Sequence, residues 1–379
     1  MKRFLFFCLF CAIIFAGCEK DEDSLIASTT HESEIITINT VWKAVNNPHI
    51  IKGYVKVTSG TLTIEPGVVV KFDAGASMEI GGTNASLIAV GTFEDRITFT
   101  SLSQSPQPGD WDYIKFKQGA IDCEMEYCVV EYGGANSSWG MIDVSGNALI
   151  SIKTCTISYS ENIAVEAEDD GNAFVAFEGN ILLGTEGKHV MKIRGKNVPT
   201  IGIGNLFTTS NNFGILVTGS SSNYNYVDLN STWKKHNAPY YIEDDIIIRN
   251  GATLTIEAGT TLKFYDGQKV QVGTSTNGTG RLIARGTSDN RITFTSASAT
   301  PQKGDWRGIE FNGQALTGNE LVYCDLLYGG SYKAIVDINP CGTNNPLVEN
   351  CIISNSNLWG IYKRKSGGVY ASPSLVNNS

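Results

Sequence analysis

The chain of 379 residues lacks the features that define several large classes of protein. Its longest apolar run, Phe4 to Phe15, has 12 residues, whereas a membrane-spanning helix needs about 20. Proline is scarce, with 10 residues, and no segment shows a sustained helical periodicity. Basic residues number 29 against 38 acidic ones, for a net charge of -9. Because no basic face is evident, we expect no nucleic-acid partner.

The motifs of common enzymes are also missing after residue 18. The four histidines are isolated, and the sequence contains no HExxH, GxSxG or Walker loop there. We therefore expect no metal and no other cofactor. The densest acidic stretch, Glu168 to Asn172, lacks the regular ligand spacing of calcium loops, so it is interpreted as a solvated turn.

Residues 1–17 have the form of a secretory signal peptide, with two basic residues, the apolar run and a small-residue end before Cys18. This segment resembles the bacterial lipobox, which implies that the acylated Cys18 becomes the mature N-terminus and binds outer-membrane lipid. Residues 19–23 (EKDED) resemble the signal that sends Bacteroidetes lipoproteins to the outer face of the outer membrane; a solvated acidic linker is the alternative. Residues 18–38 are expected to form a flexible tether.

An internal repeat dominates the rest of the chain. TLTIEPG at 61–67 recurs as TLTIEAG at 253–259, and RITFTS at 96–101 recurs at 291–296. Further matches follow in the same order: Trp42 with Trp233, Gly109-Asp110-Trp111 with Gly304-Asp305-Trp306, Tyr132-Gly133-Gly134 with Tyr328-Gly329-Gly330, and Cys155 with Cys351. We expect module 1 at 39–229 and a shortened module 2 at 230–379. The sequence leaves open whether they form one continuous rod or two.

Each module has the pattern of short strands. Apolar and polar residues alternate in runs of β-branched and aromatic residues, and Gly and Asn separate the runs. Cys128 and Cys155 are 27 residues apart, and so are Cys324 and Cys351. A strand that returns at a fixed interval indicates the coil of a solenoid, whose stacked coils pair about 4.8 Å apart as parallel sheets. The sequence therefore predicts an all-β fold, a parallel β-helix.

The repeated blocks LTIExG, ITFTS and GDW followed by IxF resemble right-handed parallel β-helix proteins of the pectin-lyase-like superfold. The resemblance covers nearly all of 39–379 and implies right-handed coils. This fold carries lyases, hydrolases, adhesins and inert spikes, so the resemblance implies an architecture and not one activity.

Catalysis on polysaccharides would need clustered carboxylates. Glu131 and Asp143 are the weak candidates, in neighbouring coils that also carry Glu124, Glu126, Glu161 and Glu166. In module 2 the position of Glu131 is taken by Leu327, although Asp143 is matched by Asp337. These observations therefore do not favour an enzyme.

Six cysteines follow Cys18: Cys123, Cys128, Cys155, Cys324, Cys341 and Cys351. If Cys128 and Cys155 take equivalent places in adjacent coils, they lie within disulfide range, and the same holds for Cys324 and Cys351. Stacked buried thiols are the equal alternative.

Aromatic residues are the best remaining indication of binding. The four tryptophans that recur between the modules are interpreted as core or cap residues. Trp139 and Trp359 do not recur, and Trp139 lies in a Gly/Ser-rich loop with Tyr132 before it and Tyr159 one coil later. Flat rings on a rigid sheet suit the faces of sugars, so these four aromatics are the ligand-binding candidates. Packing of Trp139 over the coil edge is the alternative.

These observations favour a lipid-anchored, outward-facing outer-membrane protein whose role is binding or display. A polysaccharide is the expected ligand. One alternative is a polysaccharide lyase or glycoside hydrolase. The other is a structural adhesin or spacer that contacts a host or neighbouring cell and has no small-molecule site.

Overall fold

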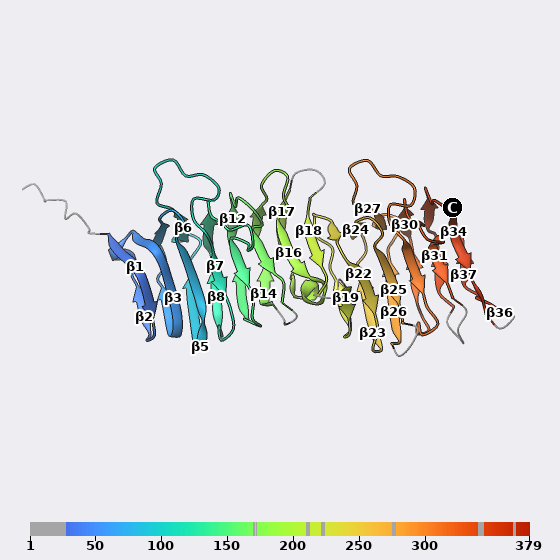
Figure 1. Ribbon diagram of the computed structural model, residues 1–379, viewed down its shortest axis with the longest axis horizontal. Coiled ribbons are helices and arrows are strands. Elements are labelled where there is room, and N and C mark those ends of the chain that lie inside the picture. Colours follow the sequence, from blue (N-terminus) through green and yellow to red (C-terminus); the bar gives the residue numbers. More distant parts are fainter. Residues whose placement is uncertain are drawn as a thin grey trace, which may run out of the picture.

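The computed structural model describes residues 28–169, 171, 173–209, 213–220, 224–274, 278–339, 345–366 and 369–379. They form a long rod of about 13 stacked turns, with the first strands at one end and the C-terminus at the other (Figure 1). Nearly every strand pairs in parallel with strands of the turns before and after it. The predicted all-β parallel β-helix is confirmed.

The stacked strands form three columns around the rod. The long strands β1(Thr29–Ile36), β3(His49–Ile64) and β5(Ser77–Val90) bend and contribute to more than one column. Column 1 continues as β4(Val69–Phe72), β6(Ile97–Ser101), β9(Cys128–Glu131), β12(Thr156–Ser158), β15(Ile181–Leu183) and β17(Leu206–Thr208). Column 2 continues as β7(Ile114–Phe116), β10(Ile142–Val144), β13(Val165–Ala167), β16(Met191–Arg194), β18(Ile215–Thr218), β21(Tyr240–Ile242), β24(Thr261–Phe264), β27(Ile292–Ser296), β30(Cys324–Leu327) and β33(Ile352–Ser354). Column 3 has β2(Thr40–Trp42), β8(Cys123–Glu126), β11(Ile150–Lys153) and β14(Phe174–Glu178).

Two separate sheets accompany column 2 in the second half of the rod. Sheet B contains β19(Tyr224–Val227), β22(Asp245–Ile248), β25(Lys269–Val272), β28(Gly308–Phe311), β31(Ala334–Ile338) and β34(Trp359–Lys363). Sheet C contains β20(Ser231–Trp233), β23(Ala252–Ile256), β26(Gly280–Arg285), β29(Glu320–Val322), β32(Leu347–Glu349) and β37(Ser374–Val376). The remaining elements are an antiparallel pair, β35(Lys365–Ser366) with β36(Val369–Tyr370), and two short 3-10 helices, η1(Ala44–Asn46) and η2(Gly195–Thr200).

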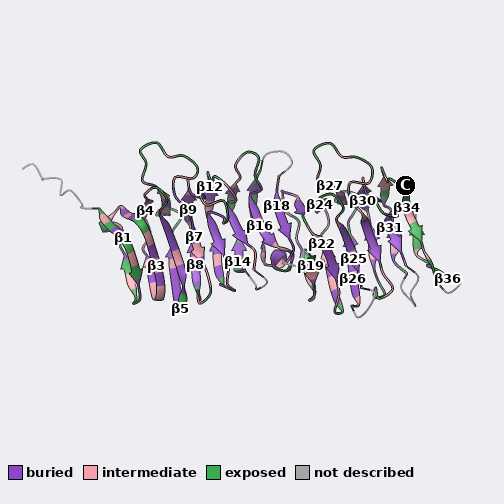
Figure 2. Cartoon of the chain, viewed as in Figure 1, coloured by how far each residue is buried: buried purple, intermediate pink, exposed green. Residues whose placement is uncertain are grey.

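The core consists of like residues stacked from turn to turn. In column 1, Val70 pairs with Phe99 and Phe99 with Val130, and all three side chains are fully buried. The strands are buried along the rod, whereas exposed residues gather in the loops and at the two ends (Figure 2). Burial of alternate residues explains the polarity alternation in the sequence.

The rod begins earlier than the sequence analysis predicted. Residues 29–36, assigned there to the flexible tether, form β1 and pair in parallel with β3. The polar composition of β1 was misleading because an end strand is covered on one side only. His31 and His49 lie side by side, with His31 Nε2 3.1 Å from His49 Nδ1, and both rings stack on Trp42 at centroid distances of 4.3 and 5.0 Å; this cluster closes the first turns.

The two modules form one continuous rod. Column 2 passes without interruption from β18 to β21, where Ile215 pairs with Tyr240, and on to β24. Equivalent strands of the two modules nevertheless lie on different faces of the rod, because module 2 is shifted by one face around the axis. Ile114 lies in column 2, whereas its repeat partner Ile309 lies in sheet B. The loops after β6 and β27 still project on the same side of the rod (Figure 1), as expected if the twist of the stacked strands offsets the change of face.

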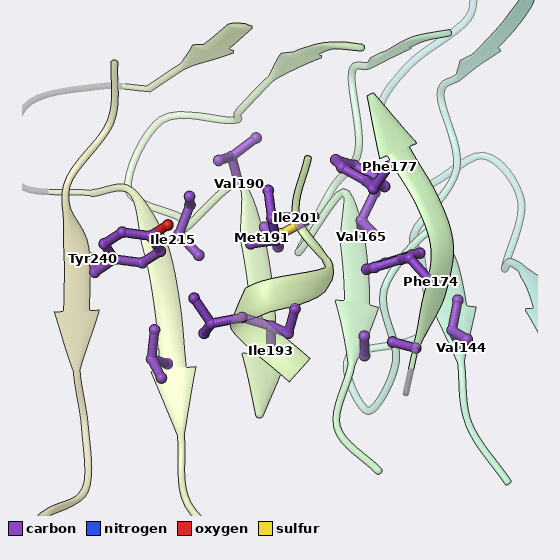
Figure 3. Close-up of a cluster of buried hydrophobic side chains, with 14 of the residues drawn as sticks. Val144, Val165, Phe174, Phe177, Val190, Met191, Ile193, Ile201, Ile215 and Tyr240 are labelled. Atoms are coloured by element: carbon purple, nitrogen blue, oxygen red, sulfur yellow. The ribbon is translucent and has the colours of Figure 1, made fainter. Parts of the chain in front are cut away.

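The change of face happens at η2, which lies between β14 and β19. Pro199 is part of η2, and proline cannot donate a ladder hydrogen bond, so a regular strand is disfavoured there. Figure 3 shows Met191 and Ile193 beside the short helix, with Ile215 and Tyr240 on the strands next to them, as part of one cluster of buried hydrophobic side chains. The core is therefore continuous where the surface changes.

Candidate functional site

The two carboxylates expected to act together are on different faces. Glu131 lies at the end of β9 in column 1, where its Oε1 accepts a hydrogen bond of 3.0 Å from Thr100 Oγ1. Asp143 lies in β10 in column 2. The two residues lie on consecutive strands of one turn, and the bend between the columns separates their strands. The structure does not combine Glu131 and Asp143 into one site.

Asp143 belongs instead to a charged strip on the outer face of column 2. The strip follows the pairing from turn to turn: Lys56, Glu79, Lys115, Asp143, Glu166 and Lys192. Lys115 Nζ is 3.1 Å from Asp143 Oδ1, and Lys192 Nζ is 3.6 Å from Glu166 Oε1. The opposite charges of Lys115 and Asp143 on adjacent strands stabilise the stack.

The two central acids of the strip are almost fully covered, with exposed fractions of 3% for Asp143 and 5% for Glu166. Burial raises the pKa of Asp143, and Lys115 opposes this rise. Burial, together with a hydrogen bond to Glu168, raises the pKa of Glu166 to about 8. Glu166 is therefore largely protonated at neutral pH.

Trp139 packs over the strip, as the alternative reading of this residue proposed. Its ring is 4.9 Å from that of Tyr113 in an edge-to-face arrangement, and Lys115 Nζ lies 3.8 Å from the Trp139 ring centroid. Both contacts are in the favourable range for their type. Trp139 is half-buried and therefore offers part of one ring to a ligand.

Tyr132 and Tyr159 form a tyrosine corner between columns 1 and 2. Their rings lie parallel, with centroids 5.0 Å apart and planes 5° from each other. Both residues have left-handed backbone, with φ of 66° and 52°, a conformation rare for bulky side chains. Tyr159 keeps 51% of its surface exposed. The sequence placed these two residues one coil apart, and the structure stacks them.

Trp359 is far from the tyrosine corner along the chain of turns. It lies in β34, which pairs with β31 in sheet B, and 63% of its surface is exposed. The four aromatic candidates therefore do not form one site. Three of them, Tyr132, Trp139 and Tyr159, lie in two consecutive turns.

The described cysteines are free thiols. Cys128, Cys155, Cys324 and Cys351 are buried, and none forms a disulfide. Cys155 Sγ donates instead to the carbonyl oxygen of Met125 at 3.5 Å, and Cys351 Sγ makes the same contact with Leu321 at 3.2 Å. The stacked-thiol reading describes this structure, and the disulfide reading does not. Cys18 and Cys341 lie outside the described residues.

A junction groove crosses sheet B where the second module begins, and sequence reasoning missed it. It consists of two hollows of about 240 and 540 Å³ that share Tyr224, Tyr226 and Arg249. The first is also lined by Arg194 and Lys196, and the second by Lys269 and Arg307. The alternation of Tyr224 and Tyr226 was visible, but the register that aligns basic residues from five segments was not.

The acidic stretch Glu168 to Asn172 lies only partly within the described residues, and its Glu168 side chain already binds other groups. Glu168 Oε2 lies 2.6 Å from Lys192 Nζ, and Thr218 Oγ1 donates to Glu168 Oε1 at 2.8 Å. Asp170 and Asn172 lie outside the described residues. Within the described part of the chain, no group of three or more His, Cys, Asp or Glu side chains could hold a metal ion, and no helix is long and apolar enough to cross a membrane.

Comparison with known proteins supports the architecture. Residues 225–335 match the family described as a pectate-lyase-like β-helix domain. No curated protein and no solved structure is significantly similar to the chain. The matched segment contains Tyr226, Arg249, Lys269 and Arg307 of the junction groove.

Proposed function

We propose that this protein is a lipid-anchored binding protein of the outer membrane that presents a rigid β-helix to glycans outside the cell. The observation that carries the proposal is the tyrosine corner, with its parallel, solvent-facing rings on a fixed backbone. Trp139 adds a further ring in the same loop as Tyr132. Preorganised aromatic rings bind at a low cost in conformational entropy.

Affinity electrophoresis in polysaccharide gels tests this proposal, with a soluble fragment of residues 24–379 that contains every described turn. We expect retardation by at least one polysaccharide and about tenfold weaker binding when Tyr132 and Tyr159 are both replaced by alanine, since each stacked ring contributes about 0.5–1.5 kcal/mol. Tyr370→Ala is the matched control, because Tyr370 is similarly exposed (57%) but lies elsewhere. If no polysaccharide retards the protein, the proposal is wrong.

The anchor is a separate part of the proposal. Cys18 is expected to carry the acyl chains, and the segment after it is expected to direct the protein to the outer face. Labelled palmitate should enter the wild-type protein and not Cys18→Ala. Protease added to intact cells should remove the rod; resistance in intact cells with digestion after lysis would place it inside.

One observation favours a second function, that of a polysaccharide lyase or glycoside hydrolase. Asp143 and Glu166 are paired carboxylates in adjacent turns, and a pKa of about 8 leaves Glu166 able to donate a proton at neutral pH. Lys115 and Lys192 lie close to these two carboxylates, and Trp139 packs against Lys115, so we put glycan binding before catalysis. New reducing ends, or unsaturated products absorbing in the ultraviolet, that vanish in Asp143→Asn would establish the enzyme.

A further inference from the structure

The junction groove has a charge opposite to that of the whole chain. Its lining includes five basic side chains, from Arg194, Lys196, Arg249, Lys269 and Arg307, against two acidic ones, Asp228 and Asp245. The chain as a whole carries a net charge of -9. Glu168 and Glu310, which pair with Arg194, Lys269 and Arg307 from beside the groove, reduce the local excess from three positive charges to one. Positive charge in a hollow attracts anions, because the surrounding protein focuses the field there.

Ion pairs hold the cations of the groove in place. Arg249 donates to both carboxylate oxygens of Asp228, from Nε at 2.6 Å and from Nη2 at 3.2 Å. Lys269, which is only 9% exposed, donates to Glu310 at 2.9 Å, and Arg307 donates to the same carboxylate at 2.8 Å. A guanidinium with two donors engaged keeps others for a ligand. The site is therefore preorganised.

Aromatic rings form part of the same surface. Tyr224 and Tyr226 point outward from β19 because Asn225 and Val227 between and after them are buried. Their centroids are 5.6 Å apart, and the guanidinium of Arg249 lies 3.5 Å from the Tyr226 ring centroid. Rings beside fixed cations suit a ligand that has both flat faces and negative groups.

The cations are spread over successive turns of the rod. Lys196 is in η2, Arg249 follows β22, Lys269 begins β25 and Arg307 precedes β28. Parallel strands are spaced about 4.8 Å apart, so the cations are spread along the rod axis. A single small anion would fill only part of a hollow of about 540 Å³, whereas an extended chain can contact cations of several turns.

We propose that the junction groove binds an acidic polysaccharide, whose carboxylate or sulfate groups pair with the cations while its sugar rings lie against Tyr224 and Tyr226. This inference takes its ligand class from the proposed function but uses a different face of the rod from the tyrosine corner. Single-stranded DNA carries the same sign of charge as an acidic polysaccharide and is therefore a competing ligand in the test below.

Calorimetric titration of the 24–379 rod tests the inference with five ligands: an oligogalacturonate and a heparin fragment as acidic chains, a neutral xylan oligomer of equal length, inorganic phosphate, and single-stranded DNA. We expect an acidic chain to bind at least tenfold more tightly than the other three and to lose affinity as salt is added. Comparable binding of the neutral chain, phosphate or DNA would overturn the inference.

Two substitutions localise the effect. Lys196→Ala removes an exposed cation and Tyr224→Ala an exposed ring, and neither side chain belongs to an ion pair within the described part of the chain. Each substitution should weaken the binding of the acidic chain about three- to tenfold. Lys235→Ala, at another exposed lysine, and Tyr370→Ala should not. Equal losses in the Lys235 control would show that only net charge matters.

The two proposals fail differently. If acidic and neutral chains bind alike and only the tyrosine-corner variant loses affinity, the junction-groove proposal is refuted and the glycan-binding proposal stands. Binding of neither class of chain would remove both. Melting temperatures of all variants within about 3 °C of wild type would show that lost binding is not lost folding.

Discussion

At the scale of single residues, the repeated GDW motif is structural. Its tryptophans are buried, as predicted, whereas the role of its aspartates was not predicted. Asp110 Oδ2 accepts hydrogen bonds from Ser101 Oγ at 2.6 Å and from the Gln107 backbone at 3.1 Å, which closes the loop after β6. Trp111 is fully buried and donates to the Glu131 carbonyl oxygen at 2.8 Å. Asp305 and Trp306 make the same contacts in module 2. In both modules the motif therefore stabilises the loop and the strand that follows it.

Glu166 makes stability depend on pH. Its pKa is about 8 in the folded chain and near 4.5 when unfolded, so between these values only the folded state binds the proton. The stability that Glu166 contributes therefore falls as pH rises from 4.5 to 8. Glu166→Gln cannot ionise, so its melting temperature relative to wild type should rise over this range and level off above it. A constant difference from pH 5 to pH 9 would contradict the raised pKa.

Cys128 and Cys324 should be unreactive in the folded protein. Burial raises the pKa of Cys128 and of Cys324 well above the usual value for a thiol. A thiol reagent such as Ellman's should therefore react slowly with the native rod and rapidly in guanidinium without any reductant. Thiols that appear in guanidinium only after reduction would mean that the pairs had formed disulfides.

At the scale of elements, local pattern predicted most of the rod. Alternation located strands such as β6 and β27, and the interval between cysteines indicated the coil. The pattern failed for β1, whose outer side is uncovered, and for η2, whose shape depends on Pro199 and on packing against β14 and β19. The change of face between modules was hidden, because pairing between turns is set by contacts far apart in sequence.

The candidate site was predicted only in part for the same reason. The stack of Tyr132 on Tyr159 followed from the coil length, since both residues directly follow strands of the same column. The separation of Glu131 from Asp143 required the position of the bend between them. The junction groove needed the register of several strands at once, and a single sequence does not contain it.

Arg96 links three turns at one corner of the rod. Its Nη2 donates to the carbonyl oxygens of Cys128 at 3.1 Å and Thr154 at 3.0 Å. Arg96→Ala should lower the free energy of unfolding by about 2–3 kcal/mol, because partly buried carbonyls lose a charged donor. Arg285→Ala, which breaks only an exposed pair with Glu320, should cost at most about 1 kcal/mol. Urea unfolding measures both changes in the free energy of unfolding. Equal losses would contradict the role of Arg96 in linking the turns.

At the scale of the whole molecule, one rod carries all the candidate surfaces on a common rigid core. Column 2 connects the modules through β16, β18, β21 and β24, so the tyrosine corner and the junction groove keep a fixed separation. A chain-like ligand could therefore meet both surfaces without a hinge, and its binding at one would raise its effective concentration at the other.

Hydrogen-exchange mass spectrometry of the 24–379 rod, with and without a saturating acidic polysaccharide, tests the claim that these surfaces bind glycans. We predict slower exchange in peptides that contain Tyr132 and Tyr159 and in those that contain Lys196 and Tyr224–Val227, with no change in sheet C. Unchanged exchange everywhere, or protection limited to sheet C, would contradict the account.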